Sequence, residues 1–213
     1  MRKATDVFGE WAEIGKDEGM EKGHSASVDE MLEFSLNERA QINRKFKFLD
    51  LGCGNGWVAR RVIKDPLCKE AIGVDGAEQM ITIAKSRAET DQYIHSDINF
   101  YNPNKKFDLI HSMEVMYYLN DPLSVLKKIN KSWLKPDGRL IIGIDLYYEN
   151  QDSHSWEEKV NTPMLMLKEL DWIDLFNQSG LVEIKSWRAN QNNGWAGTLV
   201  LTGKKDQLNK VNN

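Results

Sequence analysis

The chain has 213 residues, of which 41% are hydrophobic and 28% charged, ordinary values for one α/β domain with a full core. Its formal net charge of −4 provides no overall positive field to attract nucleic acid. The two cysteines, Cys53 and Cys68, lack metal-type spacing and favour a reducing compartment. No signal peptide or membrane-spanning stretch is recognisable. We therefore expect a cytoplasmic monomer or homodimer that binds neither membranes nor nucleic acid.

The first 26 residues differ in composition from the rest of the chain. Aromatic residues recur there at helical spacing, but residues 15–24 are polar and rich in glycine. Such a stretch is more typical of a mobile loop than of a packed element. We therefore predict a lid segment at residues 1–26, hinged at its glycines, and then a helix that Ser27 caps and that runs to about Ile42.

Short apolar runs alternate with helical stretches from residue 46 onward. We expect strands at 46–51, 70–75, 92–95, 107–112 and 139–145. A predicted helix at 164–179 is followed by two strand-like runs, 181–188 and 195–203, joined by Asn192-Asn193-Gly194 as in a hairpin. This order predicts a single α/β domain: a doubly wound, mostly parallel sheet of about seven strands, with helices on both faces and an antiparallel C-terminal hairpin strand.

A glycine-rich turn follows the first predicted strand, in the sequence Asp50-Leu51-Gly52-Cys53-Gly54-Asn55-Gly56-Trp57. Alternating glycines allow positive φ and leave no side chain between the loop and a ligand. A dinucleotide fingerprint needs its third glycine one residue later, where this chain has Trp57, and the Lys-Ser/Thr of a P-loop is missing. The turn therefore suits a ligand that lies across the strand end without a phosphate.

Two carboxylates at later strand ends indicate that this ligand contains a nucleoside. Asp75 ends the second predicted strand about 20 residues after the turn, where an acid can chelate ribose hydroxyls. Asp97 follows the third predicted strand, where it can accept a hydrogen bond from an exocyclic adenine amine.

These motifs, with residues 107–110 and 134–140, resemble the class I S-adenosylmethionine (SAM)-dependent methyltransferases of the small-molecule type in their order and spacing. The resemblance implies a Rossmann-like domain, which we assign to residues 27–204 and follow with a polar tail at 205–213. It also implies SAM as methyl donor, S-adenosylhomocysteine (SAH) as product, and no metal. The cofactor-binding residues that it implies are Asp50, Gly52, Cys53, Gly54, Asp75, Gly76, Met80, Asp97, Ile98, Ser112 and Met113. Met80 and Ile98 could equally be core residues.

Methyl transfer from a sulfonium is an in-line displacement, so the protein mainly aligns the reactants and supplies a base only for an acceptor that holds its proton tightly. Candidate catalytic residues come from three segments and are Glu114, Tyr117, His154 and His24. Candidate substrate-binding residues are Trp11, Tyr117, Tyr147, His154 and Trp156. Each could instead be a packed or solvated side chain without a role.

The acceptor is the least determined part of this interpretation. The Asn/Asp-Pro-Pro-aromatic signature of amino-group methyltransferases acting on DNA or protein is missing after the fourth strand. No separate recognition domain is evident. We therefore predict methyl transfer to an N, O or S nucleophile of a small molecule. The alternatives are an RNA or protein methyltransferase and a SAM-binding module without turnover.

Overall fold

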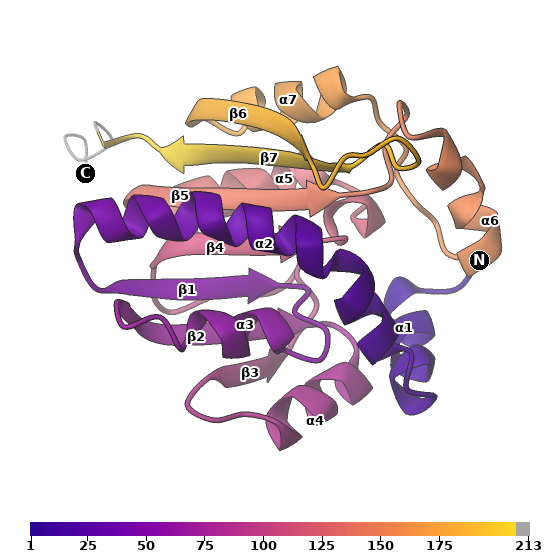
Figure 1. The fold of residues 1–213 in the computed structure, drawn as a ribbon, viewed down its shortest axis with the longest axis horizontal. Helices are drawn as coiled ribbons and strands as arrows, with labels where there is room; N and C mark the ends of the chain where they lie inside the picture. Colours follow the sequence, from indigo (N-terminus) through magenta and orange to yellow (C-terminus); the bar gives the residue numbers. More distant parts are fainter. Residues whose placement is uncertain (208–213) are drawn as a thin grey trace.

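A seven-stranded sheet forms the centre of the computed structural model, which describes residues 1–207 (Figure 1). In spatial order the strands are β3 (Gln92–His95), β2 (Cys68–Asp75), β1 (Phe46–Leu51), β4 (Phe107–Met113), β5 (Leu134–Ile144), β7 (Thr198–Lys205) and β6 (Leu181–Ala189). Strands β1 to β5 pair in parallel, and β7 runs antiparallel to both β5 and β6. The predicted fold class is confirmed, although the reversed strand lies one position inside the edge.

The strand order reverses direction between β1 and β4. The chain passes from β1 outward to β2 and β3, and then crosses to β4 and β5 on the other side of β1. Loops at the carboxyl ends of β1 and β4 therefore diverge and leave a crevice, the usual ligand site in open α/β sheets.

Helices cover the two faces of the sheet and bury a separate apolar cluster on each. The helices are α1 (Ala4–Glu13), α2 (Asp17–Ile42), α3 (Trp57–Val62), α4 (Glu78–Ser86), α5 (Pro122–Lys128), α6 (Trp156–Val160) and α7 (Glu169–Gln178). Helices α2 and α3 pack on one cluster, around Phe48 and Val58. Helices α5 and α7 pack on the other, around Trp133 and Trp172.

The prediction of a loop at residues 15–24 is wrong. Helix α2 begins at Asp17 and continues without interruption through Gly19 and Gly23. Both glycines are exposed, so each costs the helix only about 1 kcal/mol relative to alanine. Buried contacts along the inner face of α2 outweigh that cost.

The prediction that Ser27 caps a helix is also wrong. Ser27 lies inside α2, is buried, and its Oγ accepts a hydrogen bond from Thr198 Oγ1 at 2.7 Å. The boundary drawn after residue 26 therefore falls within a continuous helix that links the N-terminal segment to the sheet.

The C-terminal prediction is tested only in part. Lys205, which we assigned to the tail, is the last residue of β7. Residues 208–213 of the predicted tail lie outside the described residues. Among residues 1–207, none of the helices has the length and apolar character needed to cross a membrane.

Candidate active site

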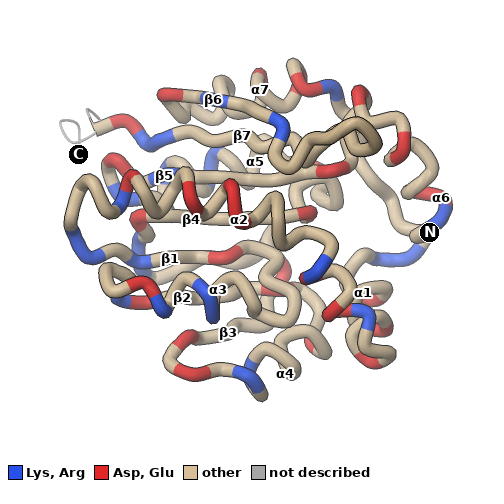
Figure 2. Tube along the Cα trace, viewed as in Figure 1, with Lys and Arg blue, Asp and Glu red and all other residues tan. Residues whose placement is uncertain are grey.

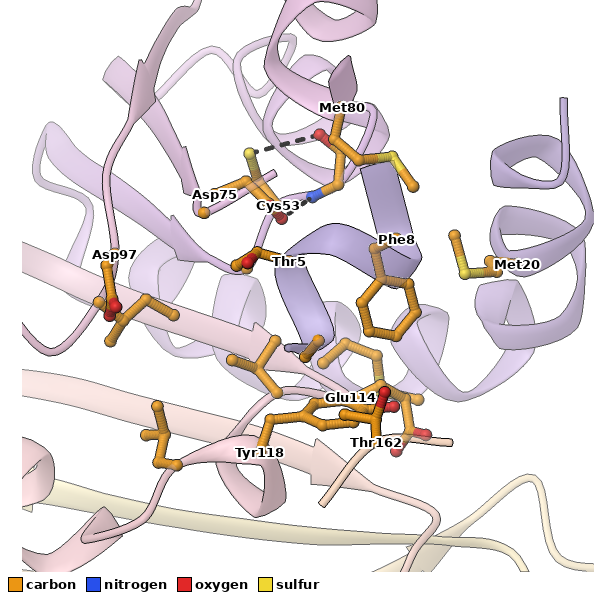
Figure 3. Close-up of a pocket in the computed structure, with 18 of the residues that line it drawn as sticks. Thr5, Phe8, Met20, Cys53, Asp75, Met80, Asp97, Glu114, Tyr118 and Thr162 are labelled. Atoms are coloured by element: carbon orange, nitrogen blue, oxygen red, sulfur yellow. Dashed lines mark hydrogen bonds between the residues drawn. The ribbon is translucent and has the colours of Figure 1, made fainter. Parts of the chain in front are cut away.

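A cavity of about 510 Å³ lies at the carboxyl ends of β1, β2 and β4. Its floor is the glycine turn after β1, and its roof is α1 with the first turns of α2. Figure 3 shows the cavity lined by Asp75, Cys53 and Met80 toward one end and by Glu114, Tyr118 and Thr162 toward the other. The residues of the predicted nucleoside site and two predicted catalytic residues, His24 and Glu114, therefore line one continuous cavity.

The glycine turn owes its shape to close packing against the segment after β4. Gly52 has φ +70°, and a Cβ there would collide with the side chain of Val115. Gly54 has φ +51°, has no atom within 4 Å of where its Cβ would lie, and so leaves space for a ligand. Its backbone N–H donates to Asp75 Oδ2 at 2.9 Å, which joins the turn to the end of β2.

Asn55 joins the same turn to the start of α2. Its Nδ2 donates to Asp17 Oδ2 at 3.0 Å and to Glu21 Oε2 at 3.3 Å. Its Oδ1 accepts from the backbone N–H of Trp57 at 3.1 Å, where α3 begins. The roof and the floor of the cavity are therefore connected through one buried amide.

Asp75 lies at the end of β2 with its carboxylate directed by the backbone. Oδ1 accepts from the N–H of Ala77 at 2.8 Å and Oδ2 from that of Gly54. Burial raises the pKa of Asp75, which these two hydrogen bonds oppose. Each carboxylate oxygen retains a free lone pair, so the group can still accept two hydroxyls.

Ten of the eleven predicted cofactor-binding residues line the cavity: Asp50, Gly52, Cys53, Gly54, Asp75, Gly76, Met80, Asp97, Ile98 and Met113. Ser112 does not, because its Oγ donates to the carbonyl of Leu51 at 2.9 Å and links β4 to β1.

A buried histidine–carboxylate pair, absent from the sequence-based predictions, lies below the turn. Asp50 and His111 are paired in register on β1 and β4, with Oδ1 and Nδ1 2.7 Å apart. Both residues line the cavity, and Asp50 Oδ2 and His111 Nε2 have no hydrogen-bond partner among the described residues. A polar ligand group would satisfy these atoms. The sequence feature that could have indicated this pair is His111 itself, a histidine within a mostly apolar strand.

A second polar cluster lies at the other end of the cavity and contains His24, Glu114 and Asp145. His24 Nε2 is 3.7 Å from Asp145 Oδ2, and Glu114 Oε1 accepts from the Asp145 backbone N–H at 2.5 Å. Tyr117 donates its hydroxyl to Glu114 Oε2 at 2.6 Å. The ligand atoms of the three clustered residues lie within 4.8 Å of one another, which is close enough to hold a metal ion.

Burial dominates the proton affinities in this cluster. It raises the pKa of Glu114 well above its ordinary value, and the charge of Asp145 raises it further. It also raises the pKa of Asp145. Burial lowers the pKa of His24, and the nearby Asp145 opposes that shift. At neutral pH the histidine is therefore a neutral base beside carboxyls that retain protons more readily than usual.

Several predicted acceptor residues lie outside this cavity. Exposed His154, whose Nε2 is 2.8 Å from the carbonyl of Tyr148, lines a separate cavity of about 190 Å³. Tyr147 is fully buried and donates its hydroxyl to the carbonyl of Gly197 at 2.8 Å. Trp156 packs against the core.

Tyr117 and Trp11 do not line the cavity but lie behind residues that do. Tyr117 is buried and reaches the site through its hydrogen bond to Glu114. Trp11 packs edge-on against Phe8, with ring centroids 5.2 Å apart. The aromatic residues that do line the cavity are Phe8, Trp57 and Tyr118, and the ring centroids of Phe8 and Tyr118 are 5.4 Å apart at 81°. Only their position after folding distinguishes them from their aromatic neighbours.

Residues 20–190 match the family model described as Methyltransferase domain. The chain belongs to this methyltransferase family. The malonyl-[acyl-carrier protein] O-methyltransferase of Halalkalibacterium halodurans is 33% identical over 115 residues, which cover 49% of this chain and 42% of that relative. The methyltransferase thus spans less than half the length of that curated relative.

Solved structures share the fold of this methyltransferase. The Haloferax volcanii partner of the Trm112 methyltransferase activator superposes with a TM-score of 0.80 at 24% identity, over 97% of this chain and 99% of that one. The magnesium protoporphyrin IX methyltransferase of Synechocystis, solved with bound SAH, has a TM-score of 0.67 at 14% identity, over 86% of this chain and 84% of that one.

Proposed function

We propose that this chain transfers a methyl group from SAM to a nucleophile of a small-molecule acceptor. One observation carries the proposal: a single cavity joins the Asp75 carboxylate and the glycine turn to a polar cluster that contains His24. The family match supports the activity, and the SAH bound to the Synechocystis fold neighbour supports the cofactor.

The residues of the cavity fit the parts of SAM. Asp75 would accept the two ribose hydroxyls, and Asp97 the adenine amine, with Met80 and Ile98 against the ring. Unpartnered Asp50 Oδ2 would accept from the methionine ammonium. When bound, SAM supplies an electrophilic methyl group and leaves as SAH.

The protein's own contribution is alignment, exclusion of water and removal of a proton. The roof formed by α1 and the start of α2 would cover the reactants, so we propose residues 1–26 as the lid. His24, whose pKa is lowered by burial, would accept the acceptor's proton. Glu114, held by Tyr117 and the Asp145 backbone, would orient the acceptor.

The charge of the cavity favours a small molecule over RNA. The carboxylates that line it are Asp17, Glu21, Asp50, Asp75, Asp97 and Glu114, whereas the lining cations are Arg2 and Lys3. Figure 2 shows basic and acidic residues interspersed along the chain, without a basic stripe leading to this end of the sheet. RNA recognition relies on cations that neutralise phosphates.

A protein activator is the alternative partner, because the Haloferax fold neighbour was solved with Trm112. Labelled-methyl transfer to a pool of metabolites, measured with the purified chain alone, distinguishes the two. Turnover without a second protein supports the proposal, and turnover only after addition of a Trm112-type protein favours the alternative.

Replacing Asp75 tests the cofactor site. We expect Asp75→Asn to weaken SAM binding by about a hundredfold, because two charge-assisted hydrogen bonds would be lost. Isothermal titration calorimetry measures the affinity, and Asp152→Asn, at an exposed position, is the matched control. Unchanged SAM affinity in the Asp75 variant would contradict the site assignment.

A further inference from the structure

The acceptor end of the cavity is an acidic pocket beside two aromatic rings. Glu114 lines it, and Asp145 lies directly behind, with its backbone N–H bonded to Glu114. Asp145 is 4% exposed, and its Oδ1 has no hydrogen-bond partner among the described residues. The neighbouring Thr198 hydroxyl donates to Ser27 and also interacts with the Asp145 carboxyl, where it opposes the rise in pKa that burial causes. A buried carboxyl oxygen with so few donors around it can accept a hydrogen bond from a ligand.

We propose that the acceptor is an amine, held at this end of the cavity by Glu114 and Asp145 and by the rings of Phe8 and Tyr118. This inference rests on the proposed function and deepens it. The two rings meet almost at right angles, with centroids 5.4 Å apart, so they form a corner beside Glu114 (Figure 3). Carboxylates with aromatic faces are the combination that recognises alkylammonium groups.

Other acceptor classes fit this pocket less well. A carboxylate would lie beside Glu114 and Asp145, whose ionised forms would repel it. A phenol or a thiol brings no positive charge to stabilise the ionised forms of these two carboxyls, which burial disfavours. His24 does not supply that charge either, because burial lowers its pKa. Arg2, at the rim, forms an ion pair with Glu10.

The cluster contains a base that can accept the proton an ammonium ion must lose. The ammonium nitrogen has no lone pair with which to attack the methyl group, so one N–H proton must first pass to His24 Nε2. The nitrogen lone pair then forms the bond to the methyl carbon as the carbon–sulfur bond breaks and its electron pair stays on sulfur. His24 is 27% exposed and can return the proton to solvent. The product is the methylated ammonium, which carries the same charge as the bound acceptor.

Four probes that share a benzyl group separate the acceptor classes: benzylamine, benzyl alcohol, benzyl mercaptan and phenylacetate. Calorimetry on the SAH-saturated protein measures their binding, and labelled methyl from SAM measures transfer. We expect benzylamine to bind at least about tenfold more tightly than the other three, and to be the preferred acceptor. Equal or weaker binding of benzylamine, or preferential methylation of oxygen or sulfur, would overturn the inference.

Charge-neutralising variants test the residues. Glu114→Gln and Asp145→Asn should each reduce benzylamine affinity about tenfold while leaving SAH and benzyl alcohol affinities unchanged. Glu33→Gln, at an exposed position of α2, is the matched control. Unchanged benzylamine affinity in both variants would contradict the proposed residues. Loss of benzylamine binding on addition of EDTA would also contradict the inference, because the cluster would then be a metal site.

A failure of the proposed function gives a different result. If the wild-type protein binds neither SAM nor SAH, the cofactor assignment itself is wrong. If it binds SAH normally and methylates benzyl alcohol, only the amine specificity is wrong. Retained SAH affinity in the Glu114 and Asp145 variants also shows that they are folded.

Discussion

His24 and His154 are both candidate bases by sequence, but they have different surroundings. His24 lines the large cavity 3.7 Å from Asp145, whereas His154 is exposed beside a separate small cavity. We expect His24→Gln to lower kcat at pH 7 by about a hundredfold, the typical contribution of a general base, and His154→Gln to leave it unchanged. Labelled-methyl transfer at saturating SAM measures both. The reverse ranking would exclude His24 as the base.

The two ends of the cavity differ in how far individual residues could be predicted. The glycine turn, Asp75 and Asp97 follow consecutive strands, and the carboxyl ends of neighbouring parallel strands necessarily meet. His24 and Asp145 are 121 positions apart in the sequence, and their approach depends on how α2 crosses the sheet. No local pattern contains that information. Phe8 and Tyr118 were indistinguishable from other aromatic residues for the same reason.

At the scale of elements, α2 shows where propensity misleads. Four glycines within the first 23 residues predicted a loop, and only Gly15, between α1 and α2, takes a left-handed conformation, with φ +74°. Gly19 and Gly23 are helical because neighbouring residues of α2 hold this stretch against the rest of the chain. Asp17 accepts a hydrogen bond from Asn55, and Met20 packs against the apolar cluster that contains Met80. The sheet was easier to predict, since its strands are short continuous apolar runs.

The glycines of α2 allow a stability test. Gly19→Ala and Gly23→Ala place Cβ atoms in open space on a helix, so each should raise the free energy of unfolding by about 0.5–1 kcal/mol. Gly15→Ala should lower it by about 1 kcal/mol, because that residue has positive φ. Urea unfolding followed by circular dichroism measures all three. No gain from either helical substitution would indicate that this stretch is not helical in solution.

Helix α1 is the element most directly tested by ligand binding. Its residues Thr5 and Phe8 line the cavity, and its packing against the rest of the chain is mainly on α4, near Met80. If α1 is a lid, SAH should slow amide hydrogen exchange in residues 4–13 by about tenfold or more, since closure suppresses local opening. Helix α7 serves as the internal control. Equal exchange in α1 with and without SAH would remove the lid from the mechanism.

For the whole molecule, α2 connects the cavity to an ionic network at the opposite end of the sheet. Glu38, near the end of α2, accepts two hydrogen bonds of 2.8 Å from the Arg139 guanidinium on β5 and pairs with Lys204 on β7 at 2.8 Å. Bidentate arginine–carboxylate geometry is among the stronger polar contacts. The helix is therefore anchored to two neighbouring strands, β5 and β7, while its first turns form part of the cavity roof.

This network predicts a specific acid sensitivity. Burial acts to raise the pKa of Glu38, but hydrogen bonds from Arg139 and Lys204 outweigh it and lower the pKa to about 2 from 4.5. A depressed carboxyl pKa stabilises the fold above pH 4.5, and the contribution is lost as the pH falls from 4.5 toward 2. Because the carboxylate is 19% exposed, we expect the contribution to be about 1–2 kcal/mol.

Urea unfolding of wild type and Glu38→Gln at pH 7, 4 and 3 measures this contribution. Other carboxyls titrate in both proteins and cancel in the difference. The glutamine variant should be less stable at pH 7 and approach the wild type at pH 3, because below pH 4.5 protonation of Glu38 in the unfolded chain offsets the advantage that its charge gives the folded state. Glu33→Gln, at an exposed position five residues earlier on α2, should show no such convergence. A stability gap between wild type and Glu38→Gln that stays constant from pH 7 to pH 3 would contradict the depressed pKa, and with it the electrostatic anchoring of α2.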